Sequence, residues 1–430
     1  MGNTYYEDAD YQDALTSYDR ALRLRPEFSE ALVNRGVTHG RLKEFLEAAA
    51  DYGEAIRLGH VSPQVFYNRG LAYRGLGESH AAVADFTEAL RLKPNHPESY
   101  LTRAAAYLDI KDYQKAIADC GEALKLKPDY PDAYYNRGLA YEGLEEFSNS
   151  IEEFSEALQL RPDYPEASAV RGVAYERLGE YRLAITDFNQ ALRLRPDYAQ
   201  TYYDRGVAHS HLRQYHESIA DYNEALRLRP EFPEALSNRG AAYNNVQEYN
   251  NAVMDCTEAL RLRPELVAAH INRAAAYIEL AEYHAAIADC NEALSLAPEY
   301  ALAYLNRGSA YRRLKESQQA ISDFTQALNL SPDLPEAYNN RAAAYIQLRQ
   351  YEKAITDCNE ALRLNSQYGS PYYNLACAYS LQQDIDLCVK NLTEALRLNQ
   401  RLKGDARSDD DLDWARHDHR VRDLLEMNDD

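Results

Sequence analysis

The chain has 430 residues and a formal net charge of -21 at pH 7, and 46% of its residues are hydrophobic, 11% aromatic and 27% charged. This composition is typical of a folded chain, and an acidic surface repels a phosphate backbone, so we expect no nucleic acid partner. No stretch approaches about eighteen consecutive apolar residues, and the first residues lack the basic flank and apolar core of a signal peptide, so we expect no membrane partner.

Prolines recur at a fixed interval along the chain. Pro26 is followed, two periods later, by eight prolines spaced 34 residues apart: Pro94, Pro128, Pro162, Pro196, Pro230, Pro264, Pro298 and Pro332. Six of the other seven prolines follow this phase by three residues, and Pro371 follows it by five. Because proline inside a helix costs about 3 kcal/mol, the spacing predicts two uninterrupted helical stretches in each period.

Residues 131–164 show the pattern within one period. Tyr134, Gly138 and Tyr141 form a stripe at helical spacing in the first half, and Phe154 and Leu158 belong to a second stripe in the other half. Only a short link separates the two halves, which forces the helices to lie antiparallel. Each period is therefore predicted to be a helical hairpin.

This pattern resembles the tetratricopeptide repeat (TPR), a helix-turn-helix of 34 residues with a small residue and a tyrosine in its first helix, alanines in its second and a proline at its end. The resemblance covers residues 1–402, as twelve units of which the first lacks its opening six residues. It implies an all-α fold, a TPR α-solenoid in which antiparallel helix hairpins form a right-handed superhelix. One such unit cannot bury its apolar face alone, so the units are expected to stack.

The two ends of the array differ from its middle. Residues 403–430 contain five basic and ten acidic residues, a net charge of -5, and resemble the capping tail that follows the last repeat in many bacterial TPR proteins. Their apolar residues are expected to pack on the last unit, with Asp429 and Asp430 free: Leu412, Trp414, Val421, Leu424 and Leu425. Because Met1 falls inside the first expected helix, we expect either that this chain is a fragment of a longer protein or that its start is assigned too far downstream.

The twelve units serve as an alignment, and one column is arginine in units two to eleven, where the usual TPR has leucine: Arg35, Arg69, Arg103, Arg137, Arg171, Arg205, Arg239, Arg273, Arg307 and Arg341. An acid stands sixteen residues after each: Asp51, Asp85, Asp119, Glu153, Asp187, Asp221, Asp255, Asp289, Asp323 and Asp357. In the last unit both columns change together, to Leu375 and Asn391. This covariation favours half-buried ion pairs within each unit over a set of solvated charges.

A second pair of columns shows size compensation. Where the first helix has a glycine, as at Gly138, the second has a phenylalanine or tyrosine, and where it has an alanine, as at Ala104, the second has a cysteine. A close-packed interior predicts this exchange, although Gly240 with Cys256 does not follow it. The cysteines are therefore interpreted as packing residues, with redox or metal roles as the alternative, and reduced thiols indicate a cytoplasmic protein.

An asparagine column precedes the arginines: Asn34, Asn68, Asn136, Asn238, Asn272, Asn306, Asn340 and Asn374. It resembles the TPR column that lines the concave surface, where side-chain amides bind the backbone of an extended peptide. The same helix face carries four tyrosines: Tyr67, Tyr135, Tyr203 and Tyr373. The alternative interpretation is that each asparagine bonds a neighbouring helix and holds the stack together.

Acidic residues on that face complete the predicted site: Glu30, Glu98, Asp132, Glu166, Glu234 and Glu336. TPR domains that bind a chaperone's C-terminal carboxylate have lysine where these acids stand, so the resemblance does not imply that activity. An acidic groove lined by tyrosines would favour a neutral or basic extended segment of a protein partner. The preferred binding segment is the unbroken run from Asn238 to Asn374.

No catalytic motif, cofactor motif or convincing metal site is found. The histidines form neither HExxH nor a nucleophile pairing, and His417 with His419 fits a solvated turn better than a metal site. The sequence therefore predicts a non-catalytic protein-interaction scaffold without a cofactor. Two alternatives remain, a regulatory TPR array of a larger enzyme and a self-associating structural scaffold.

Overall fold

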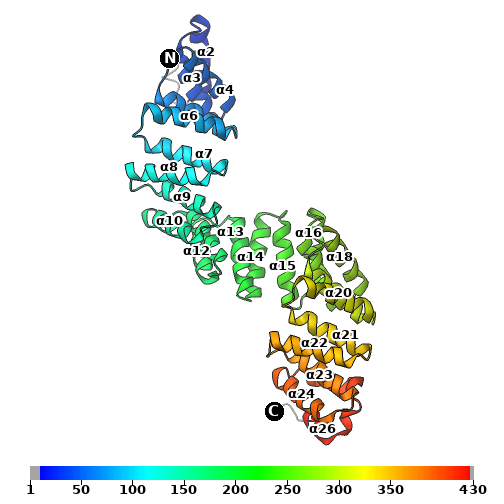
Figure 1. Ribbon diagram of the computed structural model, residues 1–430. Coiled ribbons are helices and arrows are strands. Elements are labelled where there is room, and N and C mark those ends of the chain that lie inside the picture. The colour runs from blue at the N-terminus through cyan, green and yellow to red at the C-terminus, as the bar shows by residue number, and fades with distance from the viewer. Residues whose placement is uncertain (1–9, 427–430) are drawn as a thin grey trace. The chain divides into compact units, whose positions relative to one another are not determined.

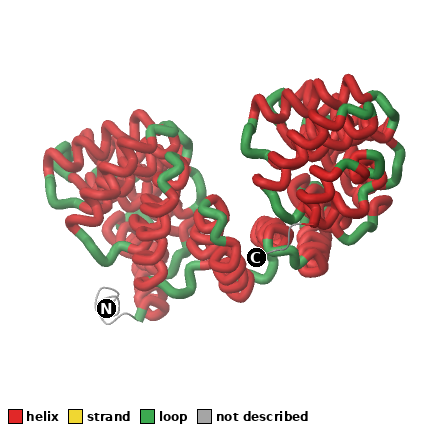
Figure 2. The backbone as a smooth tube through the Cα atoms, turned by 90° about the horizontal axis from the view of Figure 1, so that it is seen from below, coloured by secondary structure: helices red, strands yellow, loops and turns green. Residues whose placement is uncertain are grey.

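The computed structural model describes residues 10–426, and every regular element in that range is a helix (Figure 1). The chain divides into two compact units, Met1–Leu212 and Arg213–Asp430. Short loops join consecutive helices throughout (Figure 2). The predicted all-α fold of stacked hairpins is confirmed in each unit.

The first unit contains twelve described helices, in which the odd-numbered elements from α3 onward are the first helices of the hairpins. They are α2 (Tyr11–Leu24), α3 (Ser29–Arg41), α4 (Phe45–Arg57), α5 (Pro63–Gly75), α6 (Ser79–Leu92), α7 (Pro97–Asp109), α8 (Tyr113–Leu126), α9 (Pro131–Gly143), α10 (Phe147–Leu160), α11 (Pro165–Arg177), α12 (Tyr181–Leu194) and α13 (Ala199–His211).

The second unit continues the alternation and ends in shorter elements. They are α14 (Tyr215–Leu228), α15 (Pro233–Asn245), α16 (Tyr249–Leu262), α17 (Val267–Glu279), α18 (Tyr283–Leu296), α19 (Ala301–Arg313), α20 (Ser317–Leu330), α21 (Pro335–Gln347), α22 (Tyr351–Leu364), α23 (Gly369–Leu381), α24 (Ile385–Leu398), α25 (Leu402–Ser408), η1 (Asp410–Leu412), η2 (Ala415–His417) and α26 (His419–Glu426).

Proline sets the helix boundaries, as the spacing predicts. Pro97, Pro131 and Pro165 each begin a first helix, where the missing N–H leaves no hydrogen bond unmade. The turn inside each hairpin places one residue in the left-handed region, which is glycine at Gly179 (φ 78°) but alanine at Ala281 (φ 60°). Glycine is therefore favoured in this turn but not required.

Size compensation between the two helices of a hairpin is confirmed. A Cβ added to Gly138 would lie 2.6 Å from the ring of Phe154, whereas Ala104 fits against Cys120, and both of these residues are fully buried. The exception also has a steric explanation, because the Sγ of Cys256 lies 2.6 Å from the position that a Cβ on Gly240 would take. All six cysteines are buried and unpaired, as packing residues would be.

The predicted ion pairs form within each hairpin for the nine arginines whose acid lies in the same compact unit. In the pair between α11 and α12, Nε and Nη2 of Arg171 donate to the two carboxylate oxygens of Asp187, each at 2.7 Å. The Asp187 side chain is 5% exposed and that of Arg171 19%. The two helices of a hairpin are thus held in register by a two-pronged, largely buried contact.

The third donor of these arginines reaches the preceding hairpin, which the sequence analysis did not foresee. Nη1 of Arg171 donates to the Ser155 hydroxyl at 3.0 Å, and Nη1 of Arg307 donates to the Asn291 amide oxygen at 2.7 Å. The acceptor always stands sixteen residues before the arginine. At Gly53 and Gly121 that position has no side chain.

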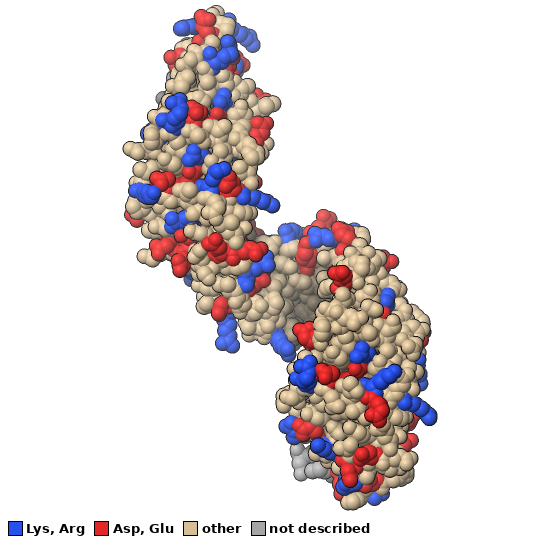
Figure 3. All heavy atoms as spheres, viewed as in Figure 1, with Lys and Arg blue, Asp and Glu red and all other residues tan. Residues whose placement is uncertain are grey.

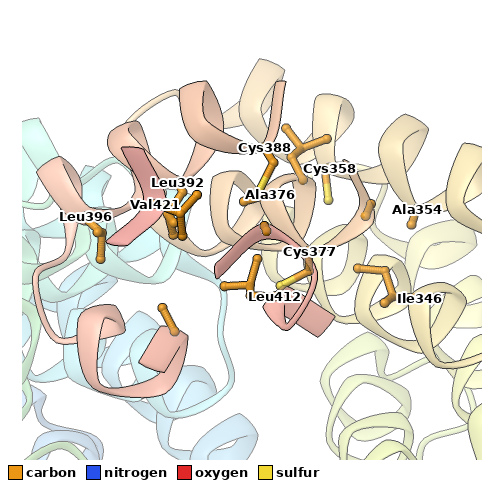
Figure 4. Packing of buried hydrophobic residues seen from close by; sticks show 14 of the residues in the cluster. Ile346, Ala354, Cys358, Ala376, Cys377, Cys388, Leu392, Leu396, Leu412 and Val421 are labelled. Carbon is orange, nitrogen blue, oxygen red and sulfur yellow. The ribbon is translucent and has the colours of Figure 1, made fainter. Parts of the chain in front are cut away.

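The C-terminal segment packs on the last hairpin (Figure 4). Leu412 and Val421 are fully buried and join Leu392 of α24 in one apolar cluster, and Leu425 is 5% exposed. Trp414 is the most exposed of the predicted capping residues, with 40% of it accessible. Asp429 and Asp430 lie outside the described residues.

Candidate functional site

The asparagine column lies on the first helices of the hairpins, from Asn34 on α3 to Asn374 on α23. Every member is half-buried, and so are the four predicted tyrosines. A half-buried side chain on a packed helix has one side against protein and another toward solvent. The column is therefore placed where it can contact a neighbouring helix and a ligand together.

In the second unit the amide nitrogens contact the preceding first helix. Nδ2 of Asn272 donates to the Ser237 carbonyl at 3.1 Å, and Nδ2 of Asn306 donates to the Ile271 carbonyl at 3.4 Å. Nδ2 of Asn374 donates to the carbonyl of Asn339 at 3.2 Å. The alternative interpretation, in which asparagines hold the stack, therefore applies to these three residues. The nitrogens of Asn272 and Asn374 also contact a second acceptor, the Ser237 hydroxyl at 3.3 Å and the Asn339 amide oxygen at 2.8 Å. The side-chain carbonyl oxygen of these amides is the atom available to another partner.

Other members of the column have different contacts. Nδ2 of Asn340 donates to the Ser309 hydroxyl at 3.4 Å, and the oxygen of Asn68 accepts from Gln64 at 2.8 Å. Within residues 10–426, no side-chain hydrogen bond is recorded for Asn136. The bond to the preceding helix is thus a property of several members and not of the whole column.

Three predicted site residues line one pocket of about 390 Å³ at the end of the second unit, namely Asn340, Tyr373 and Asn374. Side chains that the sequence analysis did not assign to a site complete its wall: Arg312, Arg313, Asn339, Gln347, Ser370, Asp405, Asp409 and Asp411. The Tyr373 hydroxyl donates to Asp409 at 2.7 Å, so the C-terminal segment forms one side of the pocket. A second pocket of about 340 Å³, in the first unit, includes Asn68.

The predicted acidic character of this face is only partly present. Asp132 pairs with Arg161 at 2.9 Å and Glu166 with Arg195 at 3.2 Å, and a close ion pair joins Glu234 to Arg263. In each pair the arginine belongs to the junction that ends the same hairpin, which neutralises the acid. Acidic and basic side chains are correspondingly interspersed on the surface seen in Figure 3.

Burial perturbs several charged groups in these first helices. Burial, reinforced by the nearby Asp204 carboxylate, raises the pKa of Glu176 to about 7, and burial also raises the pKa of Glu142. Burial lowers the pKa of Arg312, whose Nε is buried without a hydrogen-bond partner. Charges held this way are candidates for recognition of an oppositely charged ligand.

One cluster in the described range has the spacing of metal ligands, and it consists of Cys377, Asp409 and Asp411. Burial raises the pKa of the Cys377 thiol well above its usual value, and the thiol donates weakly to Asp409 at 3.7 Å. In this arrangement the Cys377 thiol acts as a hydrogen-bond donor to the Asp409 carboxylate. Among the described residues, no helix has the length and apolarity needed to cross a bilayer.

Family comparisons cover most of the repeat array. Profiles described as tetratricopeptide repeat match residues 1–63, 67–131, 103–174, 267–300, 335–368 and 370–401. A profile described as TPR repeat matches residues 177–212, 213–247 and 308–348. A search of curated proteins found no match.

Solved structures with a similar fold were found as well. The APC/C hetero-tetramer Cut9–Hcn1 is 15% identical, with 99% of this chain and 94% of that chain covered and a TM-score of 0.55. MamA from Desulfovibrio magneticus RS-1 is 27% identical over 40% of this chain and 96% of its own, with a TM-score of 0.38. YrrB, a TPR protein described as having an unusual peptide-binding site, is 20% identical over 43% and 95%, with a TM-score of 0.39.

The 34-residue hairpins, their proline boundaries and these matches agree with one another. The TPR resemblance seen in the sequence is therefore confirmed, and the all-helical solenoid is the fold that it implied. This chain belongs to the tetratricopeptide repeat family.

Proposed function

We propose that this protein is a non-catalytic scaffold that binds an extended segment of a partner protein along its first-helix face. The observation that carries the proposal is the pocket shared by Asn340, Tyr373 and Asn374, which joins members of the predicted site on successive first helices. An extended peptide offers N–H and C=O groups at regular intervals, and the remaining amide atoms of the column suit them.

The ligand is proposed to be neutral or basic overall. The net charge of -21 repels an acidic chain, and Glu336 and Asp411 belong to no ion pair within the described residues. The acids paired with junction arginines do not contribute to this preference. The preference therefore rests on the acids without an ion pair, which include Asp411 in the wall of the pocket formed by Asn340, Tyr373 and Asn374.

The test is replacement of five asparagines of the second unit by alanine: Asn238, Asn272, Asn306, Asn340 and Asn374. Binding to a pool of short basic or neutral peptides, measured by affinity capture and mass spectrometry, is expected to fall at least tenfold, since each lost hydrogen bond contributes about 1 kcal/mol. Several of these amides also hold the stack, so circular dichroism and denaturant unfolding are measured on the same protein.

The matched control replaces exposed asparagines of second helices by alanine, at Asn251, Asn329 and Asn359. This control removes the same chemistry from a different helix face and is expected to keep wild-type binding. Wild-type binding by the folded variant with five substitutions would show that the column only holds the stack.

A further inference from the structure

An ion pair between successive hairpins of the first unit provides a reference for one residue of the C-terminal pocket. Arg74, near the end of α5, donates through Nε to Asp109 on α7 at 2.8 Å. The Ser79 hydroxyl donates to the same carboxylate at 3.4 Å. The Asp109 carboxylate thus accepts from Arg74, which stands five residues after Arg69 of the arginine column, and from Ser79, which begins α6.

The second unit repeats this arrangement seven periods later with one change. Arg312 corresponds to Arg74 and Ser317 to Ser79, but Gln347 stands where Asp109 would be. The Ser317 hydroxyl donates to the Gln347 amide oxygen at 2.7 Å, so the geometry of the serine contact is kept. The arginine has lost its carboxylate.

Arg312 is left as an unpaired cation. Its Nε is buried, and no hydrogen bond or ion pair joins its guanidinium to another described residue. Leaving a buried charge without a partner is costly, and the cost is removed when a carboxylate reaches it. Arg312 and Gln347 both line the 390 Å³ pocket, so a ligand has access to that position.

We propose that this pocket binds the carboxylate of an aspartate or glutamate side chain in the partner segment, which takes the place that Asp109 takes beside Arg74. The inference rests on the proposed function and makes it more specific, because an otherwise neutral or basic segment carries one acid opposite Arg312. The acid is a specificity determinant of the bound segment.

The surroundings favour an internal side chain over a chain terminus. Asn306 lies on the same helix as Arg312, and Asn340 and Asn374 lie on the two first helices that follow, so members of the column lie before and after Arg312. A segment bound along these asparagines has residues on both sides of the one opposite Arg312, which therefore presents its side chain. Asp405, Asp409 and Asp411 line the pocket too and repel a carboxylate, so Arg312 and Arg313 are the lining residues that attract one.

The experiment uses the full chain and three pools of short acetylated peptides of neutral or basic composition. The first pool has glutamate or aspartate at its centre and an amidated end, the second has glutamine or asparagine there, and the third adds a free C-terminal carboxylate to the second. Wild type is expected to enrich the acidic pool about tenfold over the second, as measured by mass spectrometry.

Three variants locate the preference. Arg312→Gln removes the cation, and Gln347→Asp supplies an internal carboxylate, so both are expected to abolish the enrichment of the acidic pool. Gln347→Asp is also expected to raise the midpoint of denaturant unfolding, and such a rise would confirm that the new carboxylate pairs with Arg312. The control Arg74→Gln removes a paired arginine from the same column and is expected to keep the enrichment.

The outcomes separate this inference from the proposed function. Equal enrichment of the acidic pool by wild type and Arg312→Gln overturns the role of Arg312, and so does enrichment confined to the pool with a free C-terminus. Loss of binding to every pool in the five-asparagine variant supports peptide binding in either case. Failure of wild type to bind any pool overturns both proposals.

Discussion

Glu153 is the only glutamate in the acid column, and its extra methylene prevents the two aligned hydrogen bonds that arginine forms with aspartate in other hairpins. Its Oε2 lies 2.8 Å from Nε of Arg137, but the two buried atoms are not aligned for a hydrogen bond. Burial raises the pKa of this carboxyl, as expected for an acid whose charge is poorly compensated.

We expect Glu153→Asp to stabilise the protein, because aspartate forms two aligned bonds to arginine in the other hairpins. Two improved hydrogen bonds predict a gain of about 1 to 2 kcal/mol in the free energy of unfolding, measured by urea denaturation. The control Glu152→Asp changes a neighbouring exposed acid and should have little effect. A loss of stability in Glu153→Asp would contradict this explanation.

The close approach of Gly138 to Phe154 predicts a second stability effect. Gly138→Ala places a methyl group 2.6 Å from the ring, and overpacking of this kind costs about 1 to 3 kcal/mol. Adding Phe154→Cys recreates the Ala104–Cys120 pair and should recover much of the loss. A double-mutant cycle by thermal unfolding measures the coupling, and additive effects would show that the two columns are independent.

His270 predicts a pH dependence, because it lies 3.2 Å from Asp289 through Nδ1 and 3.0 Å from the Pro264 carbonyl through Nε2. The hydrogen bond to Asp289 raises the pKa of His270 above 6.5, although burial opposes it and Arg273 repels the charged ring. A raised folded-state pKa gives stability that is complete below the unfolded pKa and is lost as the pH rises through the folded value.

The stability of wild type is compared with that of His270→Tyr, which has the tyrosine that several other hairpins have at this position. Wild type should lose stability relative to this variant between about pH 6 and pH 8, measured by denaturant unfolding at several pH values. A difference that is constant with pH would mean that the ring does not titrate with folding.

For single residues, the sequence predicted which charged side chains pair with each other, but it did not predict which neighbour a half-buried asparagine contacts. Twelve internal copies revealed that Arg171 pairs with Asp187, because both columns change together at Leu375 and Asn391. They could not show that the Asn374 nitrogen faces Asn339 on the preceding helix, since a conserved column is consistent with either role. The sequence analysis did not single out Arg312, because its role depends on Gln347 standing where the reference pair has Asp109.

Nine hairpins within the two units are held together by the arginine–acid contact across their two helices, and the last hairpin shows how this contact can be replaced. There Leu375 is 4% exposed and Asn391 donates to the Leu387 carbonyl in its own helix. A charged pair and an uncharged leucine–asparagine pair therefore occupy equivalent positions in one chain.

We expect Asp187→Asn alone to destabilise the protein by about 2 kcal/mol, because Arg171 loses its charge partner while remaining largely buried. The double variant Arg171→Leu with Asp187→Asn copies the last hairpin and should recover most of that loss, as measured by urea denaturation. Equal destabilisation of the single and double variants would contradict the exchange.

Helix limits were largely predictable, because proline can begin a helix but not continue through it. Pro131 and Pro165 therefore marked the starts of α9 and α11 in the sequence. The turn was less predictable, since Ala281 and Arg349 adopt the conformation that glycine adopts at Gly179. Packing of the two helices imposes this conformation at a local cost of about 1 kcal/mol.

The C-terminal segment covers the apolar face that the last hairpin would otherwise expose. We expect Leu412→Ala to destabilise this end by about 2 to 5 kcal/mol, because the side chain is fully buried. Hydrogen exchange should accelerate in α23 and α24 while the first unit is unaffected. Trp414→Ala is the control, since that residue is 40% exposed, and a similar effect of both variants would contradict the assigned packing.

For the molecule as a whole, the sequence predicted repetition but not the division of the chain into two compact units between Leu212 and Arg213. The proline period continues unbroken from Pro196 to Pro230, so no change of pattern marks this point. Periodicity describes what the hairpins have in common and therefore carries no signal for a division between them.

Several arginines of the column bond to the hairpin before them, and this has a consequence for how the molecule unfolds. In linear repeat arrays, unfolding propagates from one repeat to the next until it meets a weak joint. Gly53 and Gly121 provide no side-chain acceptor to Arg69 and Arg137, so these joints lack a link that Ser155 provides to Arg171. Under load or mild denaturant, the first unit should break at these two joints, releasing blocks of hairpins that stay folded.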